Sequence, residues 1–352
     1  MKKLLCILCM ALAIAGCDKQ KSDKPVVKIG AILPLSGDMA VWGNSEKQGL
    51  ILALEKLPTN TKYTYKLIVE DSGNANKNVQ HIAQKLIKVD KVDAIITMFD
   101  PAANIISSLA SDNKILHFGQ SWFPQYVKDK YNYNIYANMQ DEAKLIADYF
   151  KQKRIKKVQL FTVNQTGFIN GTNILKKYLQ DSNIIYQETF FNFGEQDFRS
   201  AINKTKKFAP QAYVIGAFAP EADILTKQIK QYAGKDVLIT GLDLGLNVSN
   251  LSLYEDSVFA MPALPHNSFL DQYVKRFNDK NYLYGATIGF ISFNTIVNAY
   301  EKAQNDNVAD FLWETNEVPS IYDLSITKEH NIIYLPSQLM SIKDGEFIEF
   351  KE

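Results

Sequence analysis

Residues 26–57 constrain the fold more than any other stretch, because they place an apolar strand, a short loop and an amphipathic helix in succession. Val26–Leu33 is rich in aliphatic residues, as expected of a strand that is buried on both faces of a parallel sheet. A proline, a serine and a glycine then interrupt the regular structure. Either Asn44 or Ser45 can cap the following helix, and Ser45 has capping-box spacing with the glutamine three residues later. The sequence therefore predicts a strand–loop–helix unit with Trp42 in its loop.

Trp42 lies, on this interpretation, at the carboxyl end of a parallel strand, where open α/β sheets bind ligands. The alternative is that its ring only packs the loop onto its own domain, because large aromatic side chains are usually buried for packing. The residues of this stretch leave both roles open.

The alternation of strands and helices continues along the chain. Further strands are expected at residues 63–69, 93–99, 114–118, 158–163, 184–191, 212–218 and 237–242, with a β-rich tail at 321–350. Helices are expected at residues 79–89, 102–110, 141–153, 169–179, 197–208, 221–232, 269–278 and 286–302. Such alternation is typical of doubly wound parallel sheets. Since the pattern restarts near Tyr136–Gln140 and 352 residues can fill more than one core, we predict an α/β protein with two parallel-sheet lobes.

The first residues have the character of a targeting segment. Two lysines precede an apolar run, Leu4–Ala15, that is too short to span a bilayer comfortably. The small residues before Cys17 resemble the bacterial lipobox, in which the cysteine is acylated and becomes the new first residue; the alternative is an ordinary secretory cleavage site. The other two cysteines lie inside the run, so the mature domain has no internal disulfide. Residues 18–25 are charged, end in proline and would form a tether.

The composition and motifs give no support to several classes of function. The formal net charge is +1 and the lysines are spread along the chain, unlike the clustered basic face of a nucleic-acid-binding protein. The four histidines do not pair at metal-ligand spacing. No nucleophile–base motif such as GxSxG or HExxH is present, and the Glu70–Asp71 pair lies in a turn. We therefore expect no enzyme activity, no metal, no cofactor and no nucleic-acid partner.

Three motifs carry a resemblance to a known family. The strand that runs into LPLSG, the Trp42–Gly43 pair and the helix after it are similar to the start of the mature branched-chain amino-acid binding proteins. These are the type I periplasmic solute-binding proteins of ABC transporters. Gly194–Phe198, GEQDF, is similar to the family's G-E-x-D-F turn, and Phe218–Glu221 resembles its aromatic-x-Pro-Glu segment. The resemblance extends along most of the mature chain.

The resemblance implies a type I periplasmic binding protein fold, in which the chain crosses three times between the lobes and the short crossings form a hinge. The division that follows is a lipoprotein signal peptide at 1–16, a tether at 17–25, a first lobe at 26–140 plus 263–330, and a second lobe at 141–262 plus 331–352.

The candidate site consists of polar and aromatic residues at strand ends, which converge on one cleft if the lobes face each other. They are Trp42, Asp100, Ser121 and Trp122 from the first lobe and Thr166, Phe218 and Asp243 from the second. The resemblance implies that Asp243 faces a ligand ammonium, that Trp42 lines the side-chain pocket and that Phe218 is an aromatic contact. It also implies that Ser121 supplies a donor to the ligand carboxylate.

One position departs from the family pattern. Where amino-acid binders usually offer serine and neighbouring amides, this chain has Asp100–Ala103, DPAA. Physically, this is an aspartate cap followed by proline at the first helical position. The carboxylate would occupy the positive helix end and repel a bound carboxylate. Asp100 is therefore either a cap alone or a group that faces a cationic or carboxylate-free ligand.

The expected function is that of a lipid-anchored, extracytoplasmic solute-binding protein on the outer face of the cytoplasmic membrane. It would capture a small polar ligand, an amino acid or an amine- or amide-like compound, and deliver it to an ABC permease. Hinge closure would couple binding to recognition by the permease, and the protein would act as a monomer. The alternative is a ligand-sensing receptor or regulatory subunit of the same fold.

Overall fold

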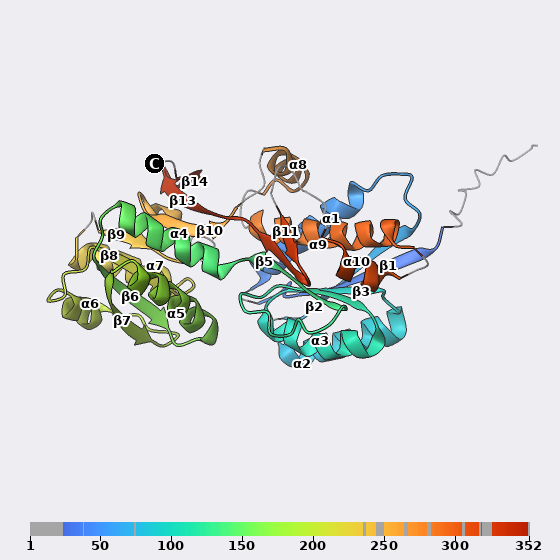
Figure 1. Ribbon diagram of the computed structural model, residues 1–352, viewed down its shortest axis with the longest axis horizontal. Coiled ribbons are helices and arrows are strands. Elements are labelled where there is room, and N and C mark those ends of the chain that lie inside the picture. The colour runs from blue at the N-terminus through green and yellow to red at the C-terminus, as the bar shows by residue number, and fades with distance from the viewer. Residues whose placement is uncertain are drawn as a thin grey trace, which may run out of the picture.

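In the computed structural model, the described residues are 24–37, 39–73, 75–234, 237–243, 250–263, 267–279, 283–304, 307–316, 318 and 326–350. They form two lobes that lie side by side, each built on a parallel sheet with helices on its faces (Figure 1). Cys17, the expected signal peptide and most of the expected tether lie outside the described residues. Among the described helices, none is both long and apolar enough to cross a membrane.

The sheet of the first lobe is organised around the predicted opening strand. That strand, β1 (Val26–Leu33), lies between β2 (Thr64–Asp71) and β3 (Ala94–Thr97) and is parallel to both. Beyond β3, the described sheet continues with β4 (Leu116–Gly119), β5 (Asn132–Ala137), β12 (Ile332–Leu335) and β11 (Thr327–Glu329). Most side chains of β1 are buried, because helices cover both faces of this sheet.

Four helices form the two layers of the first lobe. On one face, α1 (Ala40–Glu55) packs against α9 (Leu283–Lys302). On the other face lie α2 (Asn76–Lys85), which ends in a π-helical turn at Leu86–Asp90, and α3 (Asp100–Asn113). Two shorter helices, α8 (Asn267–Phe277) and α10 (Val308–Glu314), pack against α1 and α9 respectively.

The second lobe has the same architecture. Its described parallel strands follow the order β7 (Ile185–Phe191), β6 (Lys157–Val163), β8 (Ala212–Gly216) and β9 (Leu238–Thr240). The covering helices are α4 (Met139–Gln152) and α5 (Thr166–Asp181) on one face, and α6 (Arg199–Thr205) and α7 (Glu221–Tyr232) on the other. After a 3₁₀ turn at Leu251–Tyr254, an antiparallel sheet follows, made of β10 (Val258–Pro262), β13 (Ser337–Lys343) and β14 (Glu346–Glu349).

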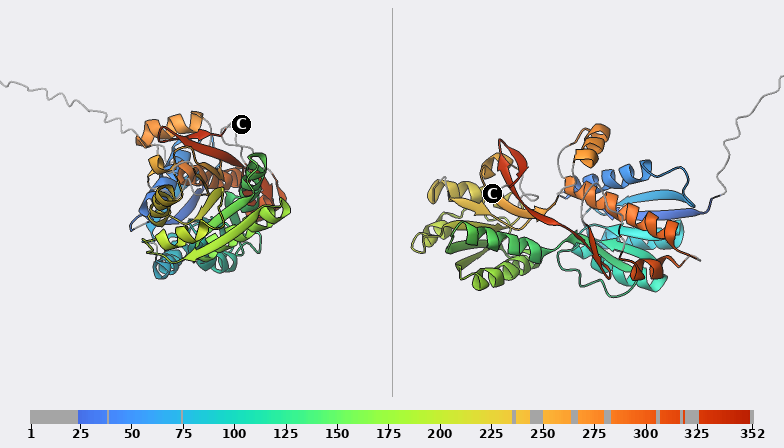
Figure 2. Two further views of the ribbon diagram at one scale, coloured as in Figure 1. Left: turned by 90° about the vertical axis from the view of Figure 1, so that its left-hand side faces the viewer. Right: turned by 45° about the horizontal axis from the view of Figure 1, so that its top comes forward.

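Within the described ranges, the chain passes between the lobes from β5 to α4 and from β12 to β13 (Figure 2). It also returns to the first lobe between β10 and α8, where residues 264–266 lie outside the described ranges. The crossing from β12 to β13 corrects the expected boundary at residue 331. Strand β12 is parallel to β5 and its Leu335, only 1% exposed, fills the core of the first lobe. The passage into the second lobe therefore falls at Pro336, because residues 332–335 complete the first sheet.

The structure also corrects the start of the first helix. Helix α1 begins at Ala40, so Trp42 lies in its first turn and not in a loop. Ser45, the expected cap, is buried one turn inside the helix, where its Oγ accepts a hydrogen bond of 3.0 Å from the Ala286 amide. The capping-box spacing was misleading, because this serine serves the contact between α1 and α9.

Candidate functional site

The lobes meet at Trp122 and Asp243. Trp122 follows β4 of the first lobe, and Asp243 follows β9 of the second. The indole Nε1 donates a hydrogen bond of 2.7 Å to Asp243 Oδ2, across 121 positions of sequence. Asp243 is fully buried and has φ of +53°, a left-handed conformation that a short polar side chain tolerates. Its own amide donates to the Ala260 carbonyl at 3.0 Å, which fixes the turn against β10.

Two tyrosines of the first lobe join this contact. Tyr136, on β5, donates its hydroxyl to the same Asp243 Oδ2 at 3.0 Å. Tyr284, on α9, packs edge-on against Tyr136 with 5.3 Å between ring centroids. Asp243 thus accepts hydrogen bonds from two first-lobe side chains, which is the expected behaviour of a carboxylate removed from water.

A second carboxyl group lies beside Asp243. Glu142, on α4, is fully buried, and its Oε2 accepts the Asp243 amide at 3.1 Å. Burial, and then the charge of Asp243, raise the pKa of Glu142 well above its ordinary value. Burial also raises the pKa of Asp243, to about 6, and the hydrogen bonds from Tyr136 and Trp122 oppose that rise. The negative charge of the pair is therefore concentrated on Asp243.

Aromatic rings of the second lobe enclose the indole. Phe168, in the first turn of α5, and Phe218, after β8, lie with their centroids 5.3 Å and 6.3 Å from that of Trp122. Gly167 allows this approach, since a Cβ there would lie 3.1 Å from the indole ring. Beneath the ring is a cavity of about 10 Å³, room for about one water molecule. It is lined by Trp122, Met139, Gly167, Phe168, Gly171, Thr172, Val214, Ile215, Gly216 and Leu242.

Asp100, at the start of α3, and Ser121, directly before Trp122, form a polar pair next to this cluster. The Ser121 hydroxyl donates to Asp100 Oδ1, and Ser121 Oγ accepts the Phe123 amide at 2.8 Å. Asp100 does not cap its helix: α3 begins at this residue, and the N-cap position is held by Phe99 without a side-chain cap bond. Burial raises the pKa of Asp100, and the Ser121 hydroxyl opposes the rise. The interpretation as a mere cap is therefore wrong.

Of the residues expected in the site, the structure brings Trp122, Phe218 and Asp243 together. Trp42 is half-buried and packs against the core of the first lobe. Thr166 is exposed at the first position of α5, directly before the Gly167–Phe168 pair that contacts the indole.

The comparisons with known proteins agree with this architecture. The sequence pattern of the family described as "Periplasmic binding protein" matches residues 26–333. The chain belongs to this family. A relative from Pseudomonas aeruginosa, named a leucine-, isoleucine-, valine-, threonine- and alanine-binding protein, is 25% identical over 243 residues. The match covers 66% of this chain and 64% of that relative, slightly less than two thirds of its length.

Two solved structures show the same fold. A branched-chain amino-acid transporter substrate-binding protein from Streptococcus pneumoniae, in complex with isoleucine, has a TM-score of 0.77 at 20% identity, covering 92% of this chain and 97% of that one. A solute-binding protein of an ABC transporter from Rhodopseudomonas palustris, in complex with 3,4-dihydroxybenzoic acid, has a TM-score of 0.77 at 20% identity, covering 92% and 96%. The expected type I periplasmic binding protein fold is therefore confirmed.

Sequence reasoning missed four members of this periplasmic binding protein's site. Phe168 could have been found, because it follows the strand β6 in the same way as the residues that were chosen. Nothing in the sequence indicates that Glu142 belongs to the site, since an acid in the first turn of a helix is usually a solvated partner of the helix dipole. Tyr136 lies within a strand and Tyr284 within a helix, and only the packing of α9 onto the sheet of the first lobe brings their rings together.

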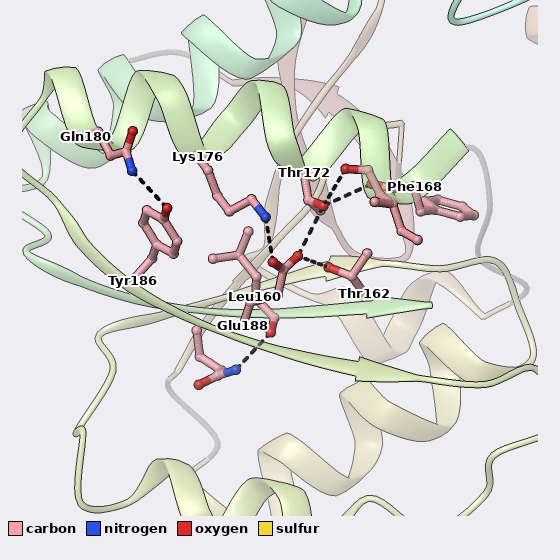
Figure 3. A network of polar contacts seen from close by, with 10 residues as sticks. Leu160, Thr162, Phe168, Thr172, Lys176, Gln180, Tyr186 and Glu188 are labelled. Atoms are coloured by element: carbon pink, nitrogen blue, oxygen red, sulfur yellow. Dashed lines mark hydrogen bonds and ion pairs between the residues drawn. The ribbon is translucent and has the colours of Figure 1, made fainter. Parts of the chain in front are cut away.

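A buried polar network holds α5, and with it Phe168, against the second sheet (Figure 3). Glu188, on β7, accepts hydrogen bonds from Thr162 at 2.9 Å and Thr172 at 3.2 Å, and forms an ion pair of 2.6 Å with Lys176. Thr172 also donates to the Phe168 carbonyl at 3.0 Å. The network therefore fixes the position of the first turn of α5 relative to the sheet, where Gly167 and Phe168 meet the indole.

Proposed function

We propose that this periplasmic binding protein captures a small polar solute, an amino acid or a related compound, between its lobes and delivers it to an ABC permease. The observation that carries the proposal is Asp243, a fully buried carboxylate of the second lobe that accepts hydrogen bonds from Trp122 and Tyr136 of the first. A buried acceptor at a junction of lobes suits a ligand with a protonated amine or another strong donor.

Hinge closure supplies the mechanism. A ligand that contacts both lobes gains its full set of interactions only when they are closed, so binding shifts the population toward the closed form. The described crossings, after β5 and after β12, are short, and they join two separately cored lobes. The permease would recognise the closed form, and the binding protein itself would need no cofactor.

The location is part of the proposal. Residues 1–16 would be removed as a signal peptide, Cys17 would carry lipid, and residues 18–25 would tether a monomeric domain to the outer face of the cytoplasmic membrane. The apolar run that stops at Ala-Gly-Cys, together with the charged residues behind it, supports this arrangement.

Asp243→Asn tests the role of the carboxylate. A thermal-shift screen of amino acids, amides and amines first finds a ligand, which should stabilise the protein by about 2.7 kcal/mol at a hundred times its Kd. Asn keeps the size of the side chain but loses the charge-assisted bond, worth about 1.5–3 kcal/mol. Calorimetric titration of the variant should show affinity lower by about one to two orders of magnitude.

Asp223→Asn is the matched control. Asp223 is also a buried aspartate of the second lobe and also accepts a tyrosine hydroxyl, that of Tyr254, at 3.0 Å. It lies on α7 and bonds a tyrosine of its own lobe, so its variant should keep the affinity even if it loses stability. An unchanged Kd in Asp243→Asn would remove this residue from the site.

A further inference from the structure

The side chain of Trp122 has the contacts of a bound molecule. Its N–H rests on Asp243 Oδ2 at 2.7 Å, and its ring lies near Phe168 and Phe218 and directly over Gly167. All four of these partners belong to the second lobe, whereas Trp122 comes from the first. A flat apolar body with a nitrogen donor is therefore a shape that this part of the second lobe accepts.

The carboxyl groups beside the indole nitrogen carry a negative charge that the neutral indole does not offset. Indole has a single N–H donor and no charge, whereas two carboxyl groups, those of Asp243 and Glu142, lie side by side. Glu142 Oε1 is buried and has no hydrogen-bond partner among the described residues. A protonated amine has up to three donors and a positive charge, so it would satisfy this pair better than the indole does.

The surroundings do not favour a carboxylate on the same ligand. None of the side chains named around Trp122 and Asp243 is basic. At the start of α3, Asp100 places a third carboxyl group beside Ser121, and Pro101 removes a backbone N–H from the helix end. A ligand carboxylate at that helix end would meet a like charge.

We propose that Trp122 is a built-in stand-in for the ligand, and that the ligand is an amine with a flat apolar body and no carboxylate, which displaces the indole from Asp243. The inference rests on the proposed function and narrows its ligand class. The indole also lines the small cavity beside Gly167, Gly171 and Gly216, so its displacement would join that cavity to the space that the ligand takes.

Three matched probes test the ligand class: tryptamine, L-tryptophan and indole-3-propionate. They share the indole and differ only in carrying the amine, both groups or the carboxylate. Calorimetric titration should show tryptamine binding at least tenfold more tightly than L-tryptophan, and no binding of indole-3-propionate. Equal or tighter binding of L-tryptophan, or no binding of tryptamine, would overturn the inference. If another ligand found by screening still depends on Asp243, the proposed function survives that failure.

Removal of the stand-in tests its role. Trp122→Ala should bind tryptamine several-fold more tightly than the wild type, because the competing side chain is gone. Small-angle scattering without any amine should show a larger radius of gyration, since one of the two hydrogen bonds from the first lobe to Asp243 is lost. Trp122→Phe keeps an aromatic ring but loses the N–H and the larger bicyclic body. It is the milder variant, which guards against misfolding, and it should shift both quantities in the same direction. Weaker tryptamine binding by both variants would show that Trp122 is an ordinary contact.

Discussion

Glu46, on helix α1 of the first lobe, is a further buried acid. It is fully buried and faces α9 so closely that a Cβ at Gly289 would lie 2.4 Å from the Glu46 carbonyl. Burial raises the pKa of the Glu46 carboxyl to about 8, and a contact with Gln120 opposes the rise. The group is therefore protonated in the folded protein at pH values where an unfolded glutamate is ionised.

The stability of the protein should consequently fall as pH rises from about 4.5 to about 8. In this window the folded state holds a proton that the unfolded state has lost, so the free energy of unfolding decreases, by at most about 1.4 kcal/mol per pH unit from this one group. In the Glu46→Gln variant this group no longer titrates, so the free energy of unfolding should decrease less steeply with pH, by the amount that Glu46 contributes. Urea unfolding at several pH values measures it, with the exposed Glu195→Gln as the control. Parallel pH curves for wild type and Glu46→Gln would contradict the prediction.

At the scale of elements, the contact between α1 and α9 depends on glycine. A Cβ at Gly49 would lie 1.9 Å from the Ala286 carbonyl oxygen, and one at Gly289 would lie 2.4 Å from the Glu46 carbonyl oxygen. The backbones of the two helices therefore approach more closely than any larger residue permits. Helix α9 also packs against β5, where Tyr284 meets Tyr136.

Gly49→Ala should destabilise the protein, because the new methyl group can be accommodated only if the helices separate. Overpacking of this kind costs about 1–3 kcal/mol and can cost more. Gly171→Ala, also in a helix, is the matched control, since its Cβ would meet Met139 at an ordinary 3.6 Å and helix propensity favours alanine by about 1 kcal/mol. Thermal unfolding compares the two variants, and a Gly49→Ala protein as stable as Gly171→Ala would contradict this account.

At the scale of the whole molecule, the two lobes have separate cores. Leu50 and Phe293 belong to the first, and Phe161 and Ile215 to the second. Trp122 and Tyr136 reach from the first lobe to Asp243 of the second. The proposed hinge closure would therefore move each lobe as a unit about the crossings, and the proposed lipid attachment site, Cys17, precedes both lobes in the sequence.

Cys17→Ser should release the protein from the membrane without affecting its fold. Acylation requires the thiol, and Cys17 is the sole cysteine of the expected mature chain. Fractionation of cells should move the variant from the membrane to the soluble fraction, while circular dichroism stays unchanged. Retention in the membrane fraction would mean that the Leu4–Ala15 run is an uncleaved anchor.

The sequence by itself determined the local elements and the family. The opening strand was predicted at Val26–Leu33 and is found at those residues, and the helices predicted at 221–232 and 286–302 correspond to α7 and α9. Patterns of this kind are readable because a strand or helix is specified by the alternation of neighbouring side chains. The Leu-Pro-Leu-Ser-Gly and Gly-Glu-x-Asp-Phe motifs were sufficient to predict the family.

Only the tertiary structure decided which strand ends meet and which groups lie between them. The bond from Trp122 to Asp243 joins residues 121 positions apart, and nothing local to either indicates the other. Ser45 was expected to cap a helix and instead accepts an amide of α9, because the close approach of two helices outweighed a local preference. The expected boundary at residue 331 placed strand β12 in the wrong lobe, also because its position depends on contacts distant in the sequence. Its place beside β5 depends on the order of strands in a sheet, which no neighbouring residue encodes.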